Sequence, residues 1–321
     1  MLNEQTPEQG QPSSWERKVL ENLVQDLVRE QKAKRRWSIF FRLVWLGFLG
    51  LIALMVFGAM SDSDAPVTYK AHTAVVRLDG VIAANEEANA ESIGKALQKA
   101  FDAPNTKGVI LKINSPGGSP VQAGMIHDEI LRLRKLHPAI PLYAVIEDIC
   151  ASGGYYVAVA ADRIYVDKAS LVGSIGVLMD GFGFTGTMDK LGVERRLITA
   201  GENKGFMDPF SPLSAKQQTY AKEMLAEIHQ QFIGVVKEGR GNRLKNDPQL
   251  FSGLVWNGAK SIELGLADGL GNVGSVSRDV IKAADLVDYT PKDSLAARLA
   301  KQAGVRFSQG VQSLSDQRTL R

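Results

Sequence analysis

The stretch GVILKINSPGGSPVQAGMIHDEILRLRKL (108–136) carries the pattern that decides the fold. Its beginning, 108–116, is rich in Val, Ile and Leu, as expected of a strand in a buried sheet. Pro120 opens a segment, 120–136, whose apolar residues recur at helical spacing. A strand, a glycine-rich turn and a helix in this order predict one unit of an α/β fold.

The same alternation extends in both directions along the chain. It predicts strands over 73–83, 141–148, 162–167, 175–179 and 193–199, and helices over 91–102, from Ser152 onward, over 214–239 and over about 273–286. Ser214 is the expected N-cap of the longest helix. Strands that alternate with helices favour a largely parallel sheet covered on its faces.

Composition limits the classes of function that the chain can have. Of its 321 residues, 38 are Lys or Arg and 35 are Asp or Glu, which gives a net charge of +3. Residues 61–321 hold 30 basic and 29 acidic side chains, so they offer no basic footprint and we expect no nucleic-acid partner. The single cysteine, Cys150, excludes an internal disulfide and a cysteine-based zinc site. We expect no metal and no cofactor.

The first sixty residues have the pattern of a single-pass membrane anchor. Residues 43–60 contain no charged side chain, and together with 39–42 they make about 33 Å of helix at about 1.5 Å per residue. That length can cross the hydrocarbon core of a bilayer. The basic run KAKRR lies just upstream and SDSDAP just downstream, which favours a cytoplasmic N-terminus and an exported body. A cleaved signal peptide is the alternative, but its apolar region would begin nearer the N-terminus.

These patterns divide the chain into four parts. They are a cytoplasmic segment (1–38), a transmembrane helix (39–60), an exported, periplasmic domain (61–302) and a polar C-terminal tail (303–321). The cytoplasmic segment has apolar pairs at 19/20, 23/24 and 27/28, which predict a helix of its own.

The turn NSPGGSP (114–120) could carry chemistry. Gly117 and Gly118 allow backbone N–H groups to point outward without interference from side chains. Such a nest can hold a developing oxyanion. An ordinary strand-to-helix turn is the alternative. No Gly-Lys-Ser/Thr follows, so this turn is not a phosphate loop.

A second turn, CASGGY (150–155), places Ser152 between a predicted strand and a predicted helix. A hydroxyl in that place can be a nucleophile, with the Gly153 N–H beside it as an oxyanion donor. Ser152 could equally be an ordinary N-cap. Ser174, in SLVGSIGV (170–177), is another polar residue in a glycine-rich turn, and its hydroxyl could orient a neutral amine. Cys150 has apolar neighbours, which favour a small buried residue over a nucleophile.

A nucleophilic serine needs a general base, and histidine is the commonest one. Each histidine of the chain has the surroundings of a structural or solvated residue, although sequence alone excludes none of them. The four are His72, His127, His137 and His229.

A lysine is the other option for the base. Burial disfavours the charged form of a lysine and can leave its amine neutral. Lys204 lies in AGENKGFMDPFSP (200–212), a glycine-flanked segment whose aromatic and methionine side chains could cover it. Lys168 and Lys190 are its competitors.

Three motifs in this order resemble those of the S49 peptidase family. They are INSPGGSP (113–120), CASGGYYVAVAADRIYVDKASLVGSIGV (150–177) and GENKGFMDPFSPLS (201–214). The likeness covers about 70–290 and is to the short, single-domain type of signal peptide peptidase, in which a membrane anchor also stands in front. The stretch VWNGAKSIELGLADGLG (255–271) is similar to the family's C-terminal signature.

This resemblance implies a ClpP/crotonase-like α/β fold and a serine endopeptidase with a serine–lysine dyad. Ser152 matches the nucleophile and Lys204 the general base. Ser174 matches the serine that hydrogen-bonds the lysine, and Gly118 and Gly153 match the oxyanion donors. One departure is visible before Lys204, where family members often carry an aromatic residue and this chain has an asparagine. The departure concerns the wall of the substrate groove.

The resemblance also implies a homo-oligomeric ring, an octamer in the short type, at the outer face of the inner membrane, with serine and lysine from neighbouring subunits. The implied substrates are cleaved signal peptides and other apolar or unfolded peptides. A SohB-like inner-membrane peptidase is the alternative within the family. Outside it, the alternatives are a non-catalytic peptide-binding scaffold and a crotonase-type enzyme that holds acyl-CoA enolates. Export of the body argues against the latter, because acyl-CoA is cytoplasmic.

Overall fold

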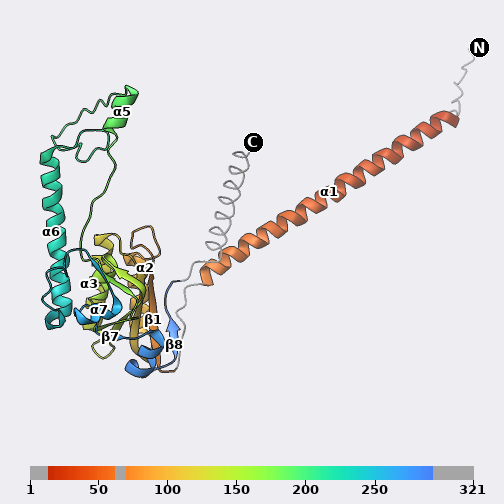
Figure 1. The fold of residues 1–321 in the computed structure, drawn as a ribbon. Helices are drawn as coiled ribbons and strands as arrows, with labels where there is room; N and C mark the ends of the chain where they lie inside the picture. The colour runs from red at the N-terminus through yellow and green to blue at the C-terminus, as the bar shows by residue number, and fades with distance from the viewer. Residues whose placement is uncertain (1–13, 62–69, 292–321) are drawn as a thin grey trace, which may run out of the picture. The chain divides into compact units, whose positions relative to one another are not determined.

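The computed structural model describes residues 14–61 and 70–291, which fall into two units. The first unit is a single helix, α1 (Ser14–Ser61). The second, residues 70–291, is built on one β-sheet (Figure 1). The expected tail, 303–321, lies outside the described residues.

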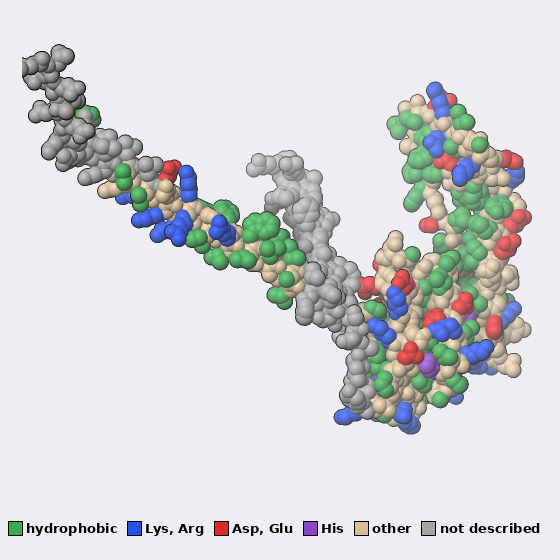
Figure 2. All heavy atoms as spheres, turned by 180° about the vertical axis from the view of Figure 1, so that it is seen from behind, with side chains coloured by type: hydrophobic (Ala, Val, Ile, Leu, Met, Phe, Trp, Pro, Cys, Tyr) green, Lys and Arg blue, Asp and Glu red, His purple; other side chains and the backbone are tan. Residues whose placement is uncertain are grey.

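Helix α1 is long and apolar enough to cross a membrane. Within its segment Val24–Leu54, the most apolar 18-residue window has a mean hydropathy of 1.9, and none of that window is buried. Figure 2 shows Lys and Arg side chains gathered beside a long apolar stretch of this helix. The helix expected upstream of residue 39 continues into the expected span without a break.

The sheet has eight strands in the order β6-β5-β3-β2-β1-β8, with β4 beside β3 and β7 beside β4. The strands are β1 (His72–Asp79), β2 (Thr106–Ser115), β3 (Leu142–Ala151), β4 (Arg163–Val166), β5 (Leu171–Gly173), β6 (Val255–Asn257), β7 (Gly269–Leu270) and β8 (Leu286–Asp288). Every pair is parallel except β5 with β6. A largely parallel sheet in an α/β fold is therefore confirmed.

Side chains that alternate along the strands form one apolar core on each face of the sheet. The larger core lies under α2 (Ala90–Asp102), α3 (Pro120–Leu136) and α4 (Gly153–Ala158). The smaller one includes Val276 of η2 (Val276–Ile281), a turn of π-helix that follows α8 (Val273–Ser275). Burial on both faces explains why the central strands are almost continuously apolar.

Helix α3 begins and ends where the sequence predicted, and its start shows why. Ser119 is the N-cap and accepts a hydrogen bond from the Gln122 N–H at 3.4 Å, and Pro120 occupies the first turn. Ser214 caps α6 (Ala215–Arg240) in the same way, accepting from the Gln217 N–H at 3.2 Å. Both expected helices are confirmed.

Only the C-terminal half of α6 packs firmly on the α/β unit, where Phe232, Ile233 and Val236 are buried. The helix is about 39 Å long at about 1.5 Å per residue. Its first half projects from the sheet together with α5 (Thr185–Leu191) (Figure 1). We call residues 180–222 the arm. Apolar side chains are exposed on it, Ile198 at 96% and Leu191 at 72%.

Three expected elements are wrong. Residues 175–179 and 193–199 form no strand, and the strand in the first region is β5, which lies just upstream. Apolar and β-branched residues make a strand only where a neighbouring strand can pair with them, and the described chain provides none at these two places. The helix expected to reach 286 ends at Ile281, because Lys282 turns into the left-handed region and the chain then enters β8. The remaining elements are η1 (Gly241–Arg243) and α7 (Gly258–Glu263).

Candidate active site

A cavity of about 580 Å³ opens where β2, β3 and β5 end, beside α3, α4 and α6. Ligands of open α/β sheets bind outside the carboxyl ends of the strands. Four of the five residues selected from the sequence line this cavity, namely Gly118, Ser152, Gly153 and Ser174. The fold thus brings together, in one cavity, residues that the sequence analysis had selected from three separate turns.

An irregularity in the pairing of β2 with β3 places Ser152 at the cavity. Ile113 pairs with Ile146, but Ser115, two residues later, pairs with Cys150, four residues later. The start of β3 therefore lies beside β4, whereas its last three residues pair with β5. Bulges of this kind change the direction of a strand and are common next to active sites. The expected strand ended at 148, and the extra residues carry it to Ala151.

Ser152 has an unusual backbone conformation, with φ 51° and ψ −122°. Its N–H donates to the Gly173 carbonyl at 2.9 Å, and its carbonyl accepts from the Tyr156 N–H at 3.0 Å. A non-glycine residue held there stores about 1–3 kcal/mol of strain, and such residues cluster at functional sites. The surrounding hydrogen bonds thus hold the Ser152 side chain in a fixed direction.

The alternative role of Ser152, an ordinary N-cap, does not fit its contacts. Ser152 stands at the N-cap position of α4, yet its side chain makes no capping hydrogen bond. By contrast, Ser119, Ser214 and Asn257 each accept a backbone N–H at the start of their helices. The Ser152 hydroxyl is therefore left available at the cavity.

The turn after β2 directs one backbone N–H toward the same cavity. The Ile82 N–H donates to the Gly117 carbonyl at 2.9 Å, and the Ser119 N–H donates to the Ile82 carbonyl at 2.7 Å. The Gly118 N–H lies in the same trans peptide as the Gly117 carbonyl, and the C=O and N–H of such a peptide point in opposite directions, so this N–H points away from Ile82. Glycine is required here, since φ of Gly118 is 150° and a Cβ would lie 2.2 Å from the Ile82 carbonyl oxygen.

The Gly118 and Gly153 backbones meet beside Ser152. A Cβ added at Gly153 would lie 3.3 Å from the Gly118 nitrogen, and one added at Gly117 would lie 2.6 Å from the Gly153 nitrogen. Among the described residues, neither the Gly118 nor the Gly153 N–H donates to another group. Two free N–H donors next to one hydroxyl can stabilise negative charge on an oxygen bound between them.

Ser174 follows β5 as Ser152 follows β3. Its φ is 53°, and its N–H donates to the Leu254 carbonyl at 2.8 Å. Both serines line the cavity and are half-buried. The proximity of their turns follows from the pairing of Ala151 with Gly173.

Lys204 is exposed on the arm and does not line the cavity within one chain. Its neighbour Glu202 pairs with Lys216, and Phe206 packs on Tyr220, so this segment lies against the start of α6. The cavity reaches α6 only at Ile228 and beyond, about 18 Å further along the helix at about 1.5 Å per residue. The fold of one chain thus separates Lys204 from Ser152.

The family model described as peptidase family S49 matches residues 134–287. Residues 134–287 are thus similar to peptidases of family S49. The matched S49 region contains Ser152, Gly153, Ser174 and Lys204, whereas Gly118 lies upstream of it.

Curated proteins with similar sequences include two that are named as a peptidase and a protease. The chain is 30% identical over 205 residues to a putative signal peptide peptidase SppA of Enterococcus faecium, covering 64% of this chain and 59% of that one. It is 32% identical over 219 residues to protease 4 of Haemophilus influenzae, covering 67% of this chain and 35% of that one.

A third relative has a different name. Over 209 residues, 64% of this chain, the identity is 44% to a protein of Brucella abortus named a Na(+)/H(+) antiporter. The alignment covers 28% of that protein. The chain spans between 28% and 59% of the length of these three relatives.

The four histidines of the chain have structural partners and none lines the cavity. His72 is buried and hydrogen-bonds the Tyr289 hydroxyl at 3.0 Å. His127 contacts Asp128, and His229 hydrogen-bonds the Ile175 carbonyl at 3.1 Å. His137 ends α3 and lies 3.3 Å from Asp102. Their contacts agree with the structural roles predicted for them.

The other candidate residues are also removed from the site. Lys168 and Lys190 are exposed and do not line the cavity. Cys150 is fully buried, as predicted, and burial raises the pKa of its thiol far above the ordinary value. A thiol in that state is a poor nucleophile.

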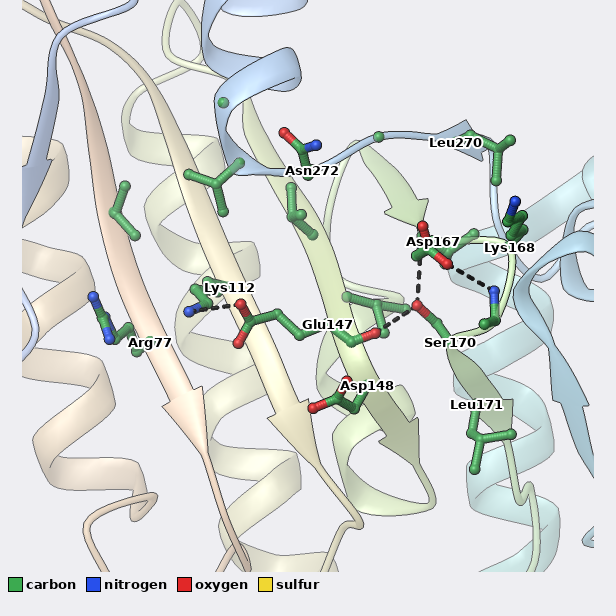
Figure 3. Close-up of a pocket in the computed structure, with 18 of the residues that line it drawn as sticks. Arg77, Lys112, Glu147, Asp148, Asp167, Lys168, Ser170, Leu171, Leu270 and Asn272 are labelled. Carbon is green, nitrogen blue, oxygen red and sulfur yellow. Dashed lines mark hydrogen bonds and ion pairs between the residues drawn. The ribbon is translucent and has the colours of Figure 1, made fainter.

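A larger cavity, of about 1180 Å³, lies over other parts of β1, β2 and β3 (Figure 3). Four of its charged side chains form two ion pairs, Lys112 with Glu147 at 2.8 Å and Arg77 with Asp288 at 2.9 Å. Ser170 at its edge donates to the Glu147 carbonyl at 2.5 Å and accepts from the Asp167 N–H at 3.0 Å. Neither Ser152 nor Ser174 lines this cavity, so we place the candidate site in the smaller one.

Sequence reasoning missed the apolar wall of the site. Tyr156 of α4 packs on Phe232 of α6 with ring centroids 5.1 Å apart, and both line the cavity. The other apolar lining residues are Ala123, Val177, Leu178 and Ile228. Tyr156 stood within a quoted motif, but nothing in the sequence indicated that α6 would lie across α4.

Proposed function

We propose that the chain is a membrane-anchored serine endopeptidase in which Ser152 is the nucleophile. One observation carries the proposal: the Ser152 hydroxyl, which makes no capping bond, stands on a strained turn beside the free Gly118 and Gly153 N–H groups. The match of residues 134–287 to a peptidase family model supports the same chemistry. No described group of three or more metal-ligating side chains offers a competing site.

The proposed reaction proceeds through an acyl-enzyme. A neutral Lys204 amine removes the proton from Ser152, and the serine oxygen forms a bond to the peptide carbonyl carbon. The carbonyl oxygen takes the electron pair of the broken π-bond and is held by the Gly118 and Gly153 N–H groups. Lys204 then gives the proton to the leaving amine as the C–N bond breaks. Lys204 then removes a proton from water, the water oxygen attacks the acyl carbon, and the bond to the Ser152 oxygen breaks as that oxygen regains the proton, which releases the peptide acid.

Electrostatic stabilisation of that oxyanion would supply much of the rate. One donor of this kind is worth about 2.7–4 kcal/mol in the transition state. Both donors are backbone groups fixed by the turns that contain them, so they need no reorganisation when charge develops. Ser174 would accept a hydrogen bond from the lysine and keep the amine directed at Ser152.

We infer that Lys204 acts on Ser152 of a neighbouring copy in a homo-oligomeric ring. In one chain the arm holds Lys204 away from its own cavity, and the arm exposes Ile198 and Leu191. Exposed apolar patches on a protein surface mark sites of association. Enclosure between two copies would also remove Lys204 from water, which favours the neutral amine. An octamer is the ring size that the family resemblance suggests.

Apolar peptides are the proposed substrates. The cavity beside Ser152 is walled by Tyr156, Leu178 and Phe232, so an apolar side chain next to the cleaved bond would be desolvated there. Signal peptides left after cleavage have such sequences, as do unfolded segments. A relative named as a signal peptide peptidase supports this class.

The proposed location is the inner membrane, with the catalytic domain (61–302) in the periplasm and residues 1–38 in the cytoplasm. A helix able to span a membrane supports the anchor, and the basic residues ahead of its apolar part support the orientation. Protease added to right-side-out and inverted vesicles would test the orientation, since only outward domains are digested. Digestion of the domain in inverted vesicles alone would reject it.

A serine-reactive phosphonate probe tests the nucleophile. We expect the detergent-solubilised full chain to be labelled, to lose its hydrolysis of a defined signal peptide in proportion, and to lose labelling in Ser152→Ala. Ser119→Ala is the matched control, since it removes a nearby N-cap hydroxyl and should leave labelling intact. Equal labelling of wild type and Ser152→Ala would reject Ser152. Binding of the peptide without any cleavage would favour a non-catalytic scaffold.

Subunit complementation tests the shared site. Ser152→Ala and Lys204→Ala are each expected to be inactive, yet co-expressed chains should regain part of the activity, because some interfaces join an intact serine to an intact lysine. If serine and lysine act within one chain, mixed assemblies would stay inactive. Mass spectrometry of the intact assembly would give the number of subunits and verify that each variant still assembles.

A further inference from the structure

Ser115 is a buried polar residue next to the candidate site that the proposed mechanism does not use. It is the last residue of β2 and is fully buried. A hydroxyl in such a place must find hydrogen-bond partners, since an unpaired buried polar group is costly.

The Ser115 hydroxyl both donates and accepts a hydrogen bond, and both partners are backbone groups in turns. It donates to the Gly80 carbonyl at 2.6 Å and accepts from the Gly117 N–H at 3.1 Å. Gly80 belongs to the turn after β1 and Gly117 to the turn after β2. One side chain therefore ties two adjacent turns together.

Ser115 also contacts the start of α4. A Cβ added at Gly154 would lie 3.0 Å from the Ser115 carbonyl oxygen and 3.4 Å from its Cβ. Gly154 follows Gly153, one of the two proposed oxyanion donors. The same residue thus lies against both turns from which the donors come.

The bond to the Gly117 N–H bears directly on the direction of the next N–H. Gly117 has φ 97° and Gly118 has φ 150°, so two residues without side chains join Pro116 to Ser119. Ile82 holds the far side of this turn, through the Gly117 carbonyl and the Ser119 N–H. The Ser115 hydroxyl holds the preceding peptide, between Pro116 and Gly117, through the Gly117 N–H. Without this bond, that peptide could rotate at the flexible Gly117 and shift the Gly118 N–H that follows.

We propose that Ser115 is a positioning residue that sets the direction of the oxyanion-binding N–H of Gly118 and, through Gly154, its spacing from Gly153. The inference rests on the proposed function and deepens it. Ser115 touches no reacting atom. It acts through the backbone, so its loss should weaken binding of the transition state more than binding of the substrate.

A comparison of two inhibitors with the full-length wild type and Ser115→Ala tests the proposal. The first is a leucine-terminated peptide aldehyde, which the Ser152 oxygen attacks so that the former carbonyl oxygen enters the oxyanion site. The second is the matching peptide acid, which binds without a new bond. For Ser115→Ala we expect kcat and aldehyde affinity to fall about tenfold or more together, while KM and acid affinity stay within about twofold.

Ser170→Ala is the matched control. Ser170 is also a buried serine that donates to a carbonyl and accepts from a backbone N–H, but at the edge of the larger cavity. It should lower thermal stability about as much as Ser115→Ala and leave kcat and the aldehyde-to-acid affinity ratio unchanged. If Ser115→Ala does not fold, Ser115→Cys, which keeps the volume with a weaker donor, takes its place in the same comparison.

Two results would overturn the inference while leaving the protease function in place. One is an active wild type whose Ser115 variant keeps its kcat. The other is an equal loss of aldehyde and acid affinity, which would mean that Ser115 only supports the fold. A wild type that hydrolyses no peptide and forms no aldehyde adduct would instead overturn the proposed function, and the inference with it.

Discussion

Ser152 and Ser174 occupy equivalent positions at the ends of two adjacent parallel strands. Ala151 pairs with Gly173, each serine follows directly, and the Ser152 N–H donates to the Gly173 carbonyl at 2.9 Å. Both serines have positive φ, 51° and 53°. Two side chains that leave adjacent strands in this way enter one cavity, which makes the pair the geometric centre of the proposed site.

Because the backbone of Ser152 is strained, a substitution that relieves the strain should raise the free energy of unfolding. Ser152→Gly should be more stable than Ser152→Ala by about 1 kcal/mol, because only glycine adopts φ 51° and ψ −122° without steric conflict. Urea unfolding of both inactive variants measures the difference. Equal stabilities would mean that Ser152 is not strained.

Ser174 should contribute to catalysis through its hydroxyl and not through its backbone conformation. We expect Ser174→Ala and Ser174→Gly to lose about 10²-fold or more in kcat alike, as when a group that orients a catalytic residue is removed. Ser174→Gly should be the more stable of the two, because φ is 53°. Peptide hydrolysis and thermal melting give the two readouts. Full activity in Ser174→Gly would contradict the orienting role.

The two oxyanion glycines should respond differently to alanine. Gly118→Ala should disrupt the turn, because its Cβ would lie 2.2 Å from the Ile82 carbonyl oxygen. Gly153→Ala should fold, since its Cβ would meet the Gly118 nitrogen and Ala123 Cβ at 3.3 Å, and yet lose about 10²-fold or more in kcat by crowding the donors. Circular dichroism and kinetics separate the effects, and a fully active Gly153→Ala would refute this arrangement.

The buried pair Arg240–Asp268 should anchor the base of α6 and make stability depend on acid. Arg240 is 1% exposed and binds both carboxylate oxygens of Asp268, at 2.8 and 3.0 Å. Burial works against ionisation of Asp268, but hydrogen bonds from Arg240 and the Ile164 N–H outweigh it, and its pKa lies below the ordinary 3.8. We expect Arg240→Ala to lose up to about 3–5 kcal/mol at neutral pH, because Asp268 would keep only the longer contact to Arg243, at 3.3 Å, and the bond from the Ile164 N–H.

The sign of the acid dependence follows from the lowered pKa of Asp268. The pair contributes fully above the unfolded value of 3.8 and loses its contribution as pH falls through the lower folded value. Asp268→Asn should therefore be less stable than wild type at pH 7 and flatten the fall in stability below about pH 4. Urea unfolding across this range is the measurement. If Asp268→Asn loses stability at acid pH as steeply as the wild type, other carboxylates are responsible for the acid dependence.

Cys150 should be inert in the folded protein. It is fully buried and its thiol pKa is strongly raised by burial, so little thiolate forms at neutral or mildly alkaline pH. We expect iodoacetamide to leave Cys150 unmodified and peptide hydrolysis unchanged until the chain is unfolded in urea. Rapid alkylation with loss of activity would point to a cysteine-dependent reaction.

Sequence patterns identified most of the secondary-structure elements and turns that depend on neighbouring residues. The apolar strands, the helix 120–136 and the cap Ser214 were predicted, because each depends on residues adjacent in sequence. The candidate residues of three turns were also predictable as candidates. Their proximity required only that parallel strands end at one edge of a sheet.

Other features depend on contacts that sequence does not display. The expected strands 175–179 and 193–199 have suitable residues but no neighbouring strand in the described chain. The bulge that carries β3 on to Ala151 arises from the pairing of Ser115 with Cys150. The wall formed by Tyr156 and Phe232 depends on how α6 crosses α4.

The sequence by itself determined an α/β sheet, an apolar N-terminal helix and a set of polar and glycine residues at strand ends, because periodicity and turn chemistry act over a few residues. Only the tertiary structure decided that Ser152 does not cap its helix, that two N–H groups stand free beside it, and that Lys204 lies apart from it on the arm. These outcomes depend on backbone direction and on packing between distant segments, and no local pattern encodes either.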